Sequence, residues 1–390
     1  MTGDPGREPV VTGVGAVTCF GYGAGTLWDA MAAATARPPD RPADPLARME
    51  LPLIHLVPGD DNGDDNGDGG GAAGRAAGFA LAAAGEALRD AGLAEAPDAA
   101  VVVGSCMGEV AVAERGRGAT GAGWDPAFRL AAAVGDRLGA TGPNLSVANA
   151  CAAGTFAVSA AADLIRAGEA ELAVAGGSDG YSRVALGCFN RLGAVDPVRC
   201  RPFDRHRAGT IFGEGAGMLV LESRARAEAR GAAVLARVGG AGWSCDAHHP
   251  TAPEPGGAQV ARAAREALGD GGPPGCVIPH GTGTRLNDVQ EAGALRAVIG
   301  PGLDRVPLYS LKALIGHTGG ASAAIAACAA VLMLRDGTVP PNVPLDDQDP
   351  DCAVWLPQSG PERLTGPGRR VLVNGYGFGG NNCSIVLEAA

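Results

Sequence analysis

The sequence has 390 residues, of which 46% are hydrophobic and 19% charged, so the chain can bury a large core without a bound group to help it fold. Its net charge of −11 comes without a basic block that could neutralise a run of phosphates, which excludes a general nucleic-acid-binding protein. No apolar run reaches the about 20 residues of a membrane span and no signal segment opens the chain, so we expect a cytoplasmic protein that makes no membrane contact.

Helical and strand patterns alternate along the chain, which predicts an α/β protein. Residues 57–74 are acidic and rich in glycine, and we predict a surface loop there without assigning it a role. An amphipathic helix over 79–93 then ends in glycine, and a buried strand follows over 100–105.

The same helix and strand pattern returns in the second half of the chain. A helix over 259–272 precedes a strand over 276–281, and Glu266-Ala267-Leu268 lies 180 residues after Glu86-Ala87-Leu88. The chain is therefore predicted to be internally duplicated, with one half over 1–230 and the other over 231–390.

The duplication relates two strand-to-helix junctions. A strand over 144–147 leads through Cys151 into a helix over 155–167, and a strand over 306–310 leads through His317 into a helix over 321–335. Both helices consist almost entirely of small and aliphatic residues, so we expect them to be buried on all sides as a central layer. Cys151 and His317 should then face each other near a pseudo-twofold axis.

Cys151 has the local setting of a nucleophile. The ten Cys show no CxxC pair and no metal-ligand spacing, so we expect free thiols and no metal site. At the start of a helix, unpaired N–H groups and the helix dipole favour a thiolate and can hold an oxyanion. Taken alone, such a cysteine is more often an inert packing residue.

Three later segments carry further candidates. His280 ends a buried strand and precedes the glycine turn Gly281-Thr282-Gly283-Thr284. Lys312, the only lysine of the chain, lies five residues before His317. The loop 374–382 leaves an apolar strand and places Phe378 between two glycines, as expected of a mobile gate.

In this order, the Cys151 turn, the His280 turn, the Lys312/His317 segment and the Phe378 loop resemble the β-ketoacyl synthases of the elongating type, found in bacterial fatty-acid and type II polyketide systems. The similarity runs from Val10 to the end of the chain. It implies the thiolase fold, a duplicated αβαβα sandwich that is normally dimeric.

The resemblance also implies a reaction. Cys151 would accept an acyl chain from an acyl carrier protein, and His280 and His317 would promote decarboxylation of a malonyl thioester and stabilise its enolate. Lys312 would fix the His317 region and assist decarboxylation. The backbone N–H groups of Cys151 and Phe378 would form the oxyanion hole, with Phe378 acting also as the gate.

The remaining implications concern the pocket and the partners. The pocket residues would be Met107, which we expect to limit chain length, together with Phe212, Thr282 and Thr284. No cofactor is expected, because the substrates would be carried on the phosphopantetheine of the carrier protein. Arg205 and Arg207 are candidates for a basic docking patch, and the dimer would be formed with a second copy or with a related chain-length-factor subunit.

Other readings stay open at this stage. A chain-length-factor-like subunit would lack the nucleophile, against which Cys151 argues. A thiolase or a starter-type synthase would use coenzyme A, and its site would combine Cys and His with a second Cys or an Asn where this chain has His317. A non-elongating acyltransferase of the same fold would use Cys151 without decarboxylation.

Overall fold

The computed structural model describes residues 4–59, 74–115, 129–366 and 369–390, so most of the acidic segment 57–74 lies outside the described residues. Its strands form a ten-stranded mixed sheet with two halves. The strands of the first half, in spatial order, are β1 (Pro9–Thr18), β8 (Gly215–Ser223), β6 (Leu172–Asp179), β4 (Ala100–Gly104) and β5 (Asn144–Val147), with β2 (Gly21–Tyr22) beside β1. The strands of the second half are β9 (Ala236–Cys245), β14 (Asn381–Glu388), β13 (Arg370–Gly377) and β10 (Cys276–Ile278).

The two halves repeat the same strand directions, as the predicted duplication requires. In the first, β8 runs antiparallel to both β1 and β6, and β4 runs parallel to β6. In the second, β9, β14 and β13 run antiparallel and β10 runs parallel to β13. A short pairing between β1 and β9, at Val10 with Arg237 and Val11 with Ala236, joins them into one sheet.

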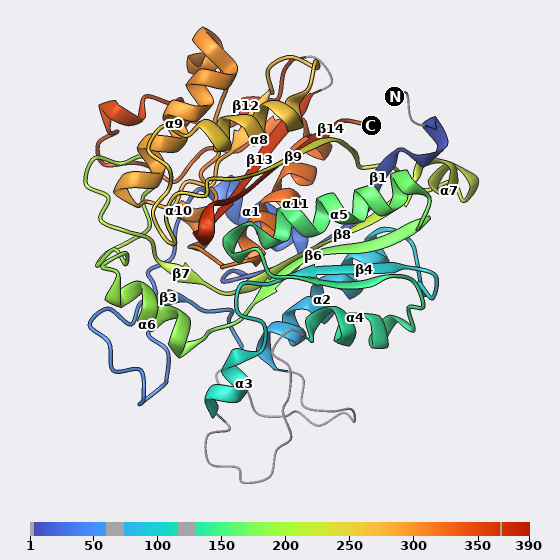
Figure 1. The fold of residues 1–390 in the computed structure, drawn as a ribbon, viewed down its shortest axis with the longest axis horizontal. Coiled ribbons are helices and arrows are strands. Elements are labelled where there is room, and N and C mark those ends of the chain that lie inside the picture. The colour runs from blue at the N-terminus through green and yellow to red at the C-terminus, as the bar shows by residue number, and fades with distance from the viewer. Residues whose placement is uncertain (1–3, 60–73, 116–128, 367–368) are drawn as a thin grey trace.

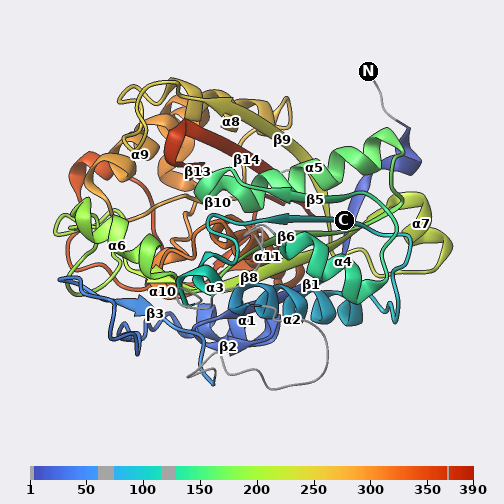
Figure 2. The same cartoon turned by 60° about the horizontal axis from the view of Figure 1, so that its bottom comes forward.

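Helices complete five layers, which follow one another from top to bottom in Figure 1. One outer layer holds α8 (Ala258–Leu268) and α9 (Arg285–Ile299), and the other holds α2 (Arg75–Asp90) and α4 (Leu130–Leu138), which Figure 2 brings forward. Between the sheet halves lie α5 (Ala153–Ala167), α11 (Ala321–Asp336) and α1 (Ala24–Ala33). The predicted αβαβα sandwich is therefore confirmed.

Short elements connect these layers. They are η1 (Pro5–Arg7), β3 (Ile54–His55), α3 (Val110–Arg115), η2 (Ala150–Ala152), α6 (Arg183–Arg191), β7 (Phe212–Gly213), α7 (Arg224–Ala229), η3 (Gly300–Arg305), α10 (Lys312–Ile315), β11 (Thr338–Val339), η4 (Pro350–Cys352), β12 (Glu362–Arg363) and η5 (Phe378–Gly380).

The central helices pack closely because small residues line their contact. A Cβ on Gly154 of α5 would lie 2.6 Å from the backbone nitrogen of Ala324 in α11, so no larger residue fits there. In α11 every residue from Ala321 to Leu334 is buried, as predicted. The expectation of burial on all sides is wrong for the last turns of α5, where Asp163 and Arg166 pair with each other at the surface.

The predicted strand over 306–310 is also corrected. This segment forms only isolated bridges, from Leu308 to Val277 of β10 and from Pro307 to Trp355. Pro307 has no N–H to donate to a ladder, although its carbonyl accepts the N–H of Val277 at 3.0 Å. The segment nevertheless occupies, beside β10, the place that β5 occupies beside β4.

Candidate active site

Cys151 lies in the short turn η2, between strand β5 and the central helix α5. The residue before it, Ala150, has a φ of +49°, a left-handed conformation that is strained for a residue with a Cβ. The N–H of Gly154 donates to the carbonyl of Gly320 at 3.0 Å, which ties the turn to the start of α11. A sharp, strained turn of this kind projects a nucleophile away from the backbone around it.

His280 and His317 line one cavity with Cys151, and Lys312 contacts His280. The three side chains come from the second half of the chain, and each is at most 7% exposed. The rings of His280 and His317 lie edge to face, with centroids 5.5 Å apart and an interplanar angle of 86°. The side chains of His317 and Cys151 line the same cavity. The structure thus brings together the four residues that the sequence singled out for chemistry.

The environment favours the thiolate of Cys151. The pKa of the Cys151 thiol is held well below its ordinary value, and the interaction with the thiol of Cys106 contributes most. Burial opposes this effect, and the positive charge near His317 and Lys312 adds to it. Cys106 is a neighbour that the sequence analysis did not single out.

His280 is held as a neutral ring of one tautomer. Burial, followed by the charges of Lys312 and His317, lowers the pKa of His280 well below its ordinary value. The backbone N–H of Tyr376 donates to Nδ1 at 3.3 Å, and Nζ of Lys312 lies 3.5 Å from the same nitrogen and also donates to the carbonyl of His280. Because Nδ1 accepts, the proton of the neutral ring is on Nε2, which is free to donate into the site.

His317 is positioned by the start of α11. Its Nδ1 lies 2.9 Å from the hydroxyl of Ser322, which in turn accepts the N–H of Thr318 at 2.9 Å. Its ring stacks on Phe212 at a centroid distance of 5.8 Å. Phe212, which the sequence analysis assigned to the substrate pocket, therefore packs against the imidazole of His317. Ser322 was not anticipated, because a serine in the first turn of an apolar helix gives no specific signal.

Two buried carboxylates of α9 shape the turn after His280. Glu291 accepts the N–H groups of His280 and Gly281, each at 2.7 Å, and burial raises its pKa to about 7. Asp288 accepts the N–H groups of Thr282 and Gly283 at 3.0 and 3.1 Å. The four backbone donors that the turn would otherwise leave unpaired are thereby satisfied.

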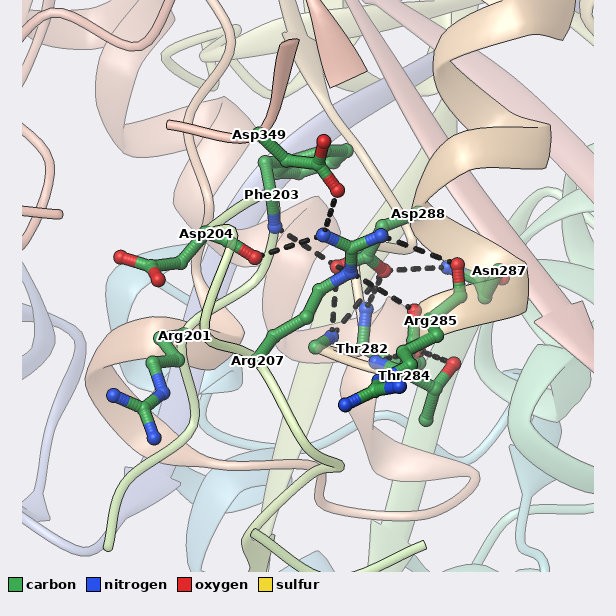
Figure 3. A network of polar contacts seen from close by, with 12 residues as sticks. Arg201, Phe203, Asp204, Arg207, Thr282, Thr284, Arg285, Asn287, Asp288 and Asp349 are labelled. Carbon is green, nitrogen blue, oxygen red and sulfur yellow. Dashed lines mark hydrogen bonds and ion pairs between the residues drawn. The ribbon is translucent and has the colours of Figure 1, made fainter. Parts of the chain in front are cut away.

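Arg207 belongs to this scaffold and not to a docking patch. Its side chain is only 3% exposed, and Figure 3 shows it at the centre of a polar network. It pairs with Asp349 and with Asp288, and donates to the carbonyl of Arg285 at 3.2 Å. Its charge is neutralised inside the protein, which corrects the expectation that it faces a partner. Arg205 does lie at the surface, 55% exposed and 3.1 Å from Asp347.

The glycine-rich loop at the end of β13 places an aromatic ring at the site. Phe378 stacks on Phe189 of α6 with centroids 5.2 Å apart and 10° between the planes. A Cβ on Gly377 would lie 2.8 Å from the carbonyl oxygen of Asn149 and 3.1 Å from the backbone nitrogen of Cys151, so glycine is required for this approach. Gly379 has a φ of +80° and donates its N–H to the carbonyl of Pro250. Phe189 has no sequence signal of its own and was missed.

A cavity of about 540 Å³ opens in front of these groups. Its walls include Cys151, His280, His317, Phe378, Thr282 and Thr284. The hydroxyls of these two threonines lie 2.9 Å apart. Met107 does not line this cavity; it lies in the loop after β4, next to Cys106.

Comparison with known proteins agrees with this geometry. The family model described as the N-terminal domain of beta-ketoacyl synthase matches residues 7–227, and the model of the C-terminal domain matches residues 235–346. The chain is 34% identical to a protein named as polyketide beta-ketoacyl synthase 1 of Streptomyces halstedii, with 98% of each chain covered. It is also 34% identical to 3-oxoacyl-[acyl-carrier-protein] synthase 2 of Synechocystis, over 64% of this chain and 62% of that one.

Solved structures show the same fold. The structure described as the ishigamide ketosynthase/chain length factor superposes with a TM-score of 0.86 at 32% identity, covering 98% of this chain and 99% of that one. A structure of a type II polyketide acyl-carrier protein in complex with its ketosynthase bound to the hexaketide superposes with a TM-score of 0.87 at 26% identity, covering 98% and 100%.

Proposed function

Given that the chain belongs to the β-ketoacyl synthase family and is an acyltransferase, we propose that it condenses an acyl group held on Cys151 with malonyl-acyl carrier protein. The setting is type II polyketide or fatty-acid-like biosynthesis. The observation that carries the proposal is the pair of buried imidazoles, with ring centroids 5.5 Å apart, that lines one cavity with the Cys151 thiol.

The first step is acyl transfer. The thiolate of Cys151 attacks the thioester carbonyl of the acyl carrier protein, a carbon–sulfur bond forms, and the phosphopantetheine thiolate leaves. The oxyanion lies between the backbone N–H groups of Cys151 and Phe378. The close approach of the Gly377 backbone to the Cys151 nitrogen, where a Cβ would lie only 3.1 Å away, supports this pairing because it brings the two chain segments into contact. Loss of one such donor would cost about 10²–10³ in rate.

The second step is decarboxylation and condensation. When malonyl-carrier protein loses CO2, the electron pair of the broken bond becomes an enolate, and its oxygen accepts hydrogen bonds from His280 and His317. The enolate carbon then attacks the carbonyl of acyl-Cys151, and collapse of the adduct returns the Cys151 thiolate and releases a 3-oxoacyl carrier. A neutral His280 with its proton on Nε2 suits this role, since it donates without first being protonated. Lys312 holds His280 through its carbonyl.

The carrier protein docks where the cavity opens. Arg285 and Leu286 line this opening, both are exposed, and Leu286 is 65% exposed. The phosphopantetheine arm would pass Thr282 and Thr284 to reach Cys151. Arg285→Glu should raise KM for an acidic carrier several-fold with little change in kcat. Arg205→Glu tests whether the carrier also docks at Arg205, which does not line the cavity. An unchanged KM in both variants would refute docking through these arginines.

The dimer forms at the edge of the sheet. β5 is the last strand of the first half in the described part of the chain, and Leu145 within it is 43% exposed. An exposed strand edge is a template for pairing with another chain. We place a second copy or a related chain-length-factor subunit there, since structures similar to this one are named as ketosynthase with chain length factor.

The halves 1–230 and 231–390 contribute different groups, the nucleophile from the first and the imidazoles and Lys312 from the second. The cytoplasm is the proposed location. Within the described residues, only the segment Ala150–Ala167 is long and apolar enough for a membrane span, and 67% of it is buried in the fold, as in a core helix. The protein uses no cofactor of its own, because its substrates arrive on the carrier.

Product analysis tests the proposal. Incubation with acyl- and malonyl-carrier protein should release labelled CO2 and yield the 3-oxoacyl carrier extended by one unit. Acyl transfer without CO2 release would instead indicate a non-elongating acyltransferase. No acyl transfer with any carrier, alone or with a related subunit, would indicate a chain-length-factor-like role and overturn the proposal.

A further inference from the structure

Among the residues that the structure describes, two buried polar side chains in the wall of the active-site cavity have an atom without a hydrogen-bond partner. Tyr376, near the end of β13, is 6% exposed, and Gln290 of α9 is 7% exposed. The unpaired atoms are the hydroxyl of Tyr376 and Oε1 of Gln290. None of the proposed steps uses either atom.

An unpaired polar atom inside a protein is costly, because it gives up its hydrogen bonds to water and gains none in return. Native interiors pair nearly all such atoms, so an exception in a cavity wall indicates a ligand as the partner. Phenylalanine at Tyr376 and methionine at Gln290 would fill similar space without this cost. The two polar side chains are therefore better explained by binding than by packing.

Tyr376 and Gln290 belong to the same wall of the cavity. The Tyr376 ring packs with Val260 of α8 and Ala294 of α9 in one apolar cluster. Ala294 lies one turn after Gln290, so the two share a face of α9. A Cβ on Gly257 would lie 3.3 Å from Ala294 and 3.4 Å from Nε2 of Gln290, which shows that this face is turned toward the Gly257 turn and α8.

Tyr376 supplies a donor. Burial, followed by the charge of Glu291, raises the pKa of Tyr376 well above its ordinary value, so the hydroxyl keeps its proton. The nearby Ser384 opposes this rise, but its hydroxyl donates to Asn374 at 2.8 Å and makes no hydrogen bond with Tyr376. The phenol is therefore available to a ligand.

Gln290 supplies an acceptor. Its Nε2 donates to the carbonyl of Glu254 at 3.3 Å, whereas the reversed amide would place two oxygens against each other. The carboxylate of Asp246, which accepts Nδ2 of Asn382 at 2.7 Å, lines the same cavity and disfavours an anion there. The site thus suits a neutral group that both donates and accepts, such as a secondary amide.

The two side chains lie on the way from the mouth of the cavity to the imidazoles. Gln290 follows the exposed Leu286 by one turn of α9 and is itself buried, so it lies deeper along the same face. At the inner end, the ring centroids of Tyr376 and His280 are 5.4 Å apart. The arm that carries the thioester follows this path, and each of its amide groups offers one N–H and one carbonyl oxygen.

We propose that Tyr376 and Gln290 form a subsite for the amide of the carrier's arm that lies nearest the thioester. The inference rests on the proposed function, in which this arm delivers the acyl group to Cys151. The Tyr376 hydroxyl donates to the amide oxygen, and Oε1 of Gln290 accepts the amide N–H. The subsite selects the arm as well as the acyl group, because a thioester without the amide leaves both atoms unpaired.

The experiment measures the second-order rate constant for acylation of Cys151, read by intact mass, with three small donors that share one acyl group. The first is the thioester of N-acetylcysteamine, which has an amide at the position nearest the sulfur. The second replaces the amide N–H by an ester oxygen, and the third replaces the whole amide by methylene groups. Acyl-carrier protein serves as a fourth donor.

Each variant should respond to the atom that it can no longer bind. Tyr376→Phe should slow acylation by the amide and ester donors about two- to tenfold, because both keep the carbonyl oxygen. Gln290→Met should slow acylation by the amide donor to a similar extent and leave the ester donor unaffected. Neither variant should change the rate with the methylene donor, and both should show the loss with acyl-carrier protein.

Two control variants and a stability measurement separate binding from structure. Tyr181→Phe removes a phenol that is bonded to Asp44 at 3.1 Å, and Gln259→Met changes a glutamine of α8. Neither residue lines the cavity, so both variants should acylate at the rates of the unmodified protein. Because its hydroxyl is buried without a partner among the described residues, Tyr376→Phe should also raise the midpoint of thermal unfolding.

Equal losses with all donors, or no loss with any, would overturn the inference while leaving the role of Cys151 intact. A lowered unfolding midpoint in Tyr376→Phe would also overturn it, because the hydroxyl would then stabilise the protein itself. If neither the small donors nor acyl-carrier protein acylates Cys151 in the unmodified protein, the proposed function itself fails.

Discussion

Replacement of Arg207 by leucine tests whether the polar network behind the active site is structural. The substitution removes a guanidinium that is 3% exposed and leaves Asp288, which is fully buried, without its ion-pair partner. It also removes the donors to the carbonyls of Asp204 and Arg285, at 2.8 and 3.2 Å. Breaking a buried pair from one side typically costs about 3–5 kcal/mol, so Arg207→Leu should lower the free energy of unfolding by that amount.

Denaturant unfolding of Arg207→Leu beside Arg205→Leu provides the measurement and its matched control. Arg205 is 55% exposed and pairs with Asp347, which is 43% exposed, so its replacement should cost at most about 1 kcal/mol. Because Asp288 also holds the turn after His280, Arg207→Leu should reduce kcat as well. Equal stability losses in the two variants, or weaker carrier binding with unchanged stability in Arg207→Leu, would refute this reasoning.

Three further predictions concern the site itself. His280→Ala should lower malonyl decarboxylation about 10²–10³-fold while Cys151 is still acylated, and equal loss of both steps would contradict the assigned role. Because burial keeps the pKa of His280 below its ordinary value, the rate of CO2 release should show no histidine-like fall as the pH drops from about 8 to about 6.5, and such a fall would show that His280 titrates there. Met107→Ala tests the sequence-based prediction that Met107 limits chain length: a longer accepted acyl chain across a panel of acyl-carrier proteins would support it, and an unchanged profile, as expected of a residue outside the cavity, would dismiss it.

Much of the fold could be predicted, because the repeated order of helices and strands and the apolar central helices can both be recognised in the sequence. The junctions at Cys151 and His317 are related by the repeat, and the all-apolar helix after His317 had to be buried. The failed strand over 306–310 shows the limit of such patterns. Its residues are apolar enough for a strand, but Pro307 lacks the N–H that a ladder needs, and its carbonyl is used instead.

Side-chain partners distant in the sequence could not be predicted. Arg207 lies among other charged residues, and nothing local shows that it meets Asp288 and Asp349, which are 81 and 142 positions away. Arginine is usually exposed, so a docking role was the natural hypothesis. The strained φ of Ala150 was equally hidden, because alanine gives no sign of a left-handed turn.

The most direct test of the central claim is the intact mass of the protein after incubation with acyl-carrier protein, followed by peptide mapping of the adduct. The account predicts one acyl group on Cys151, absent from Cys151→Ala and retained in His280→Ala. An adduct that persists in Cys151→Ala, or one that maps to another residue, would contradict it.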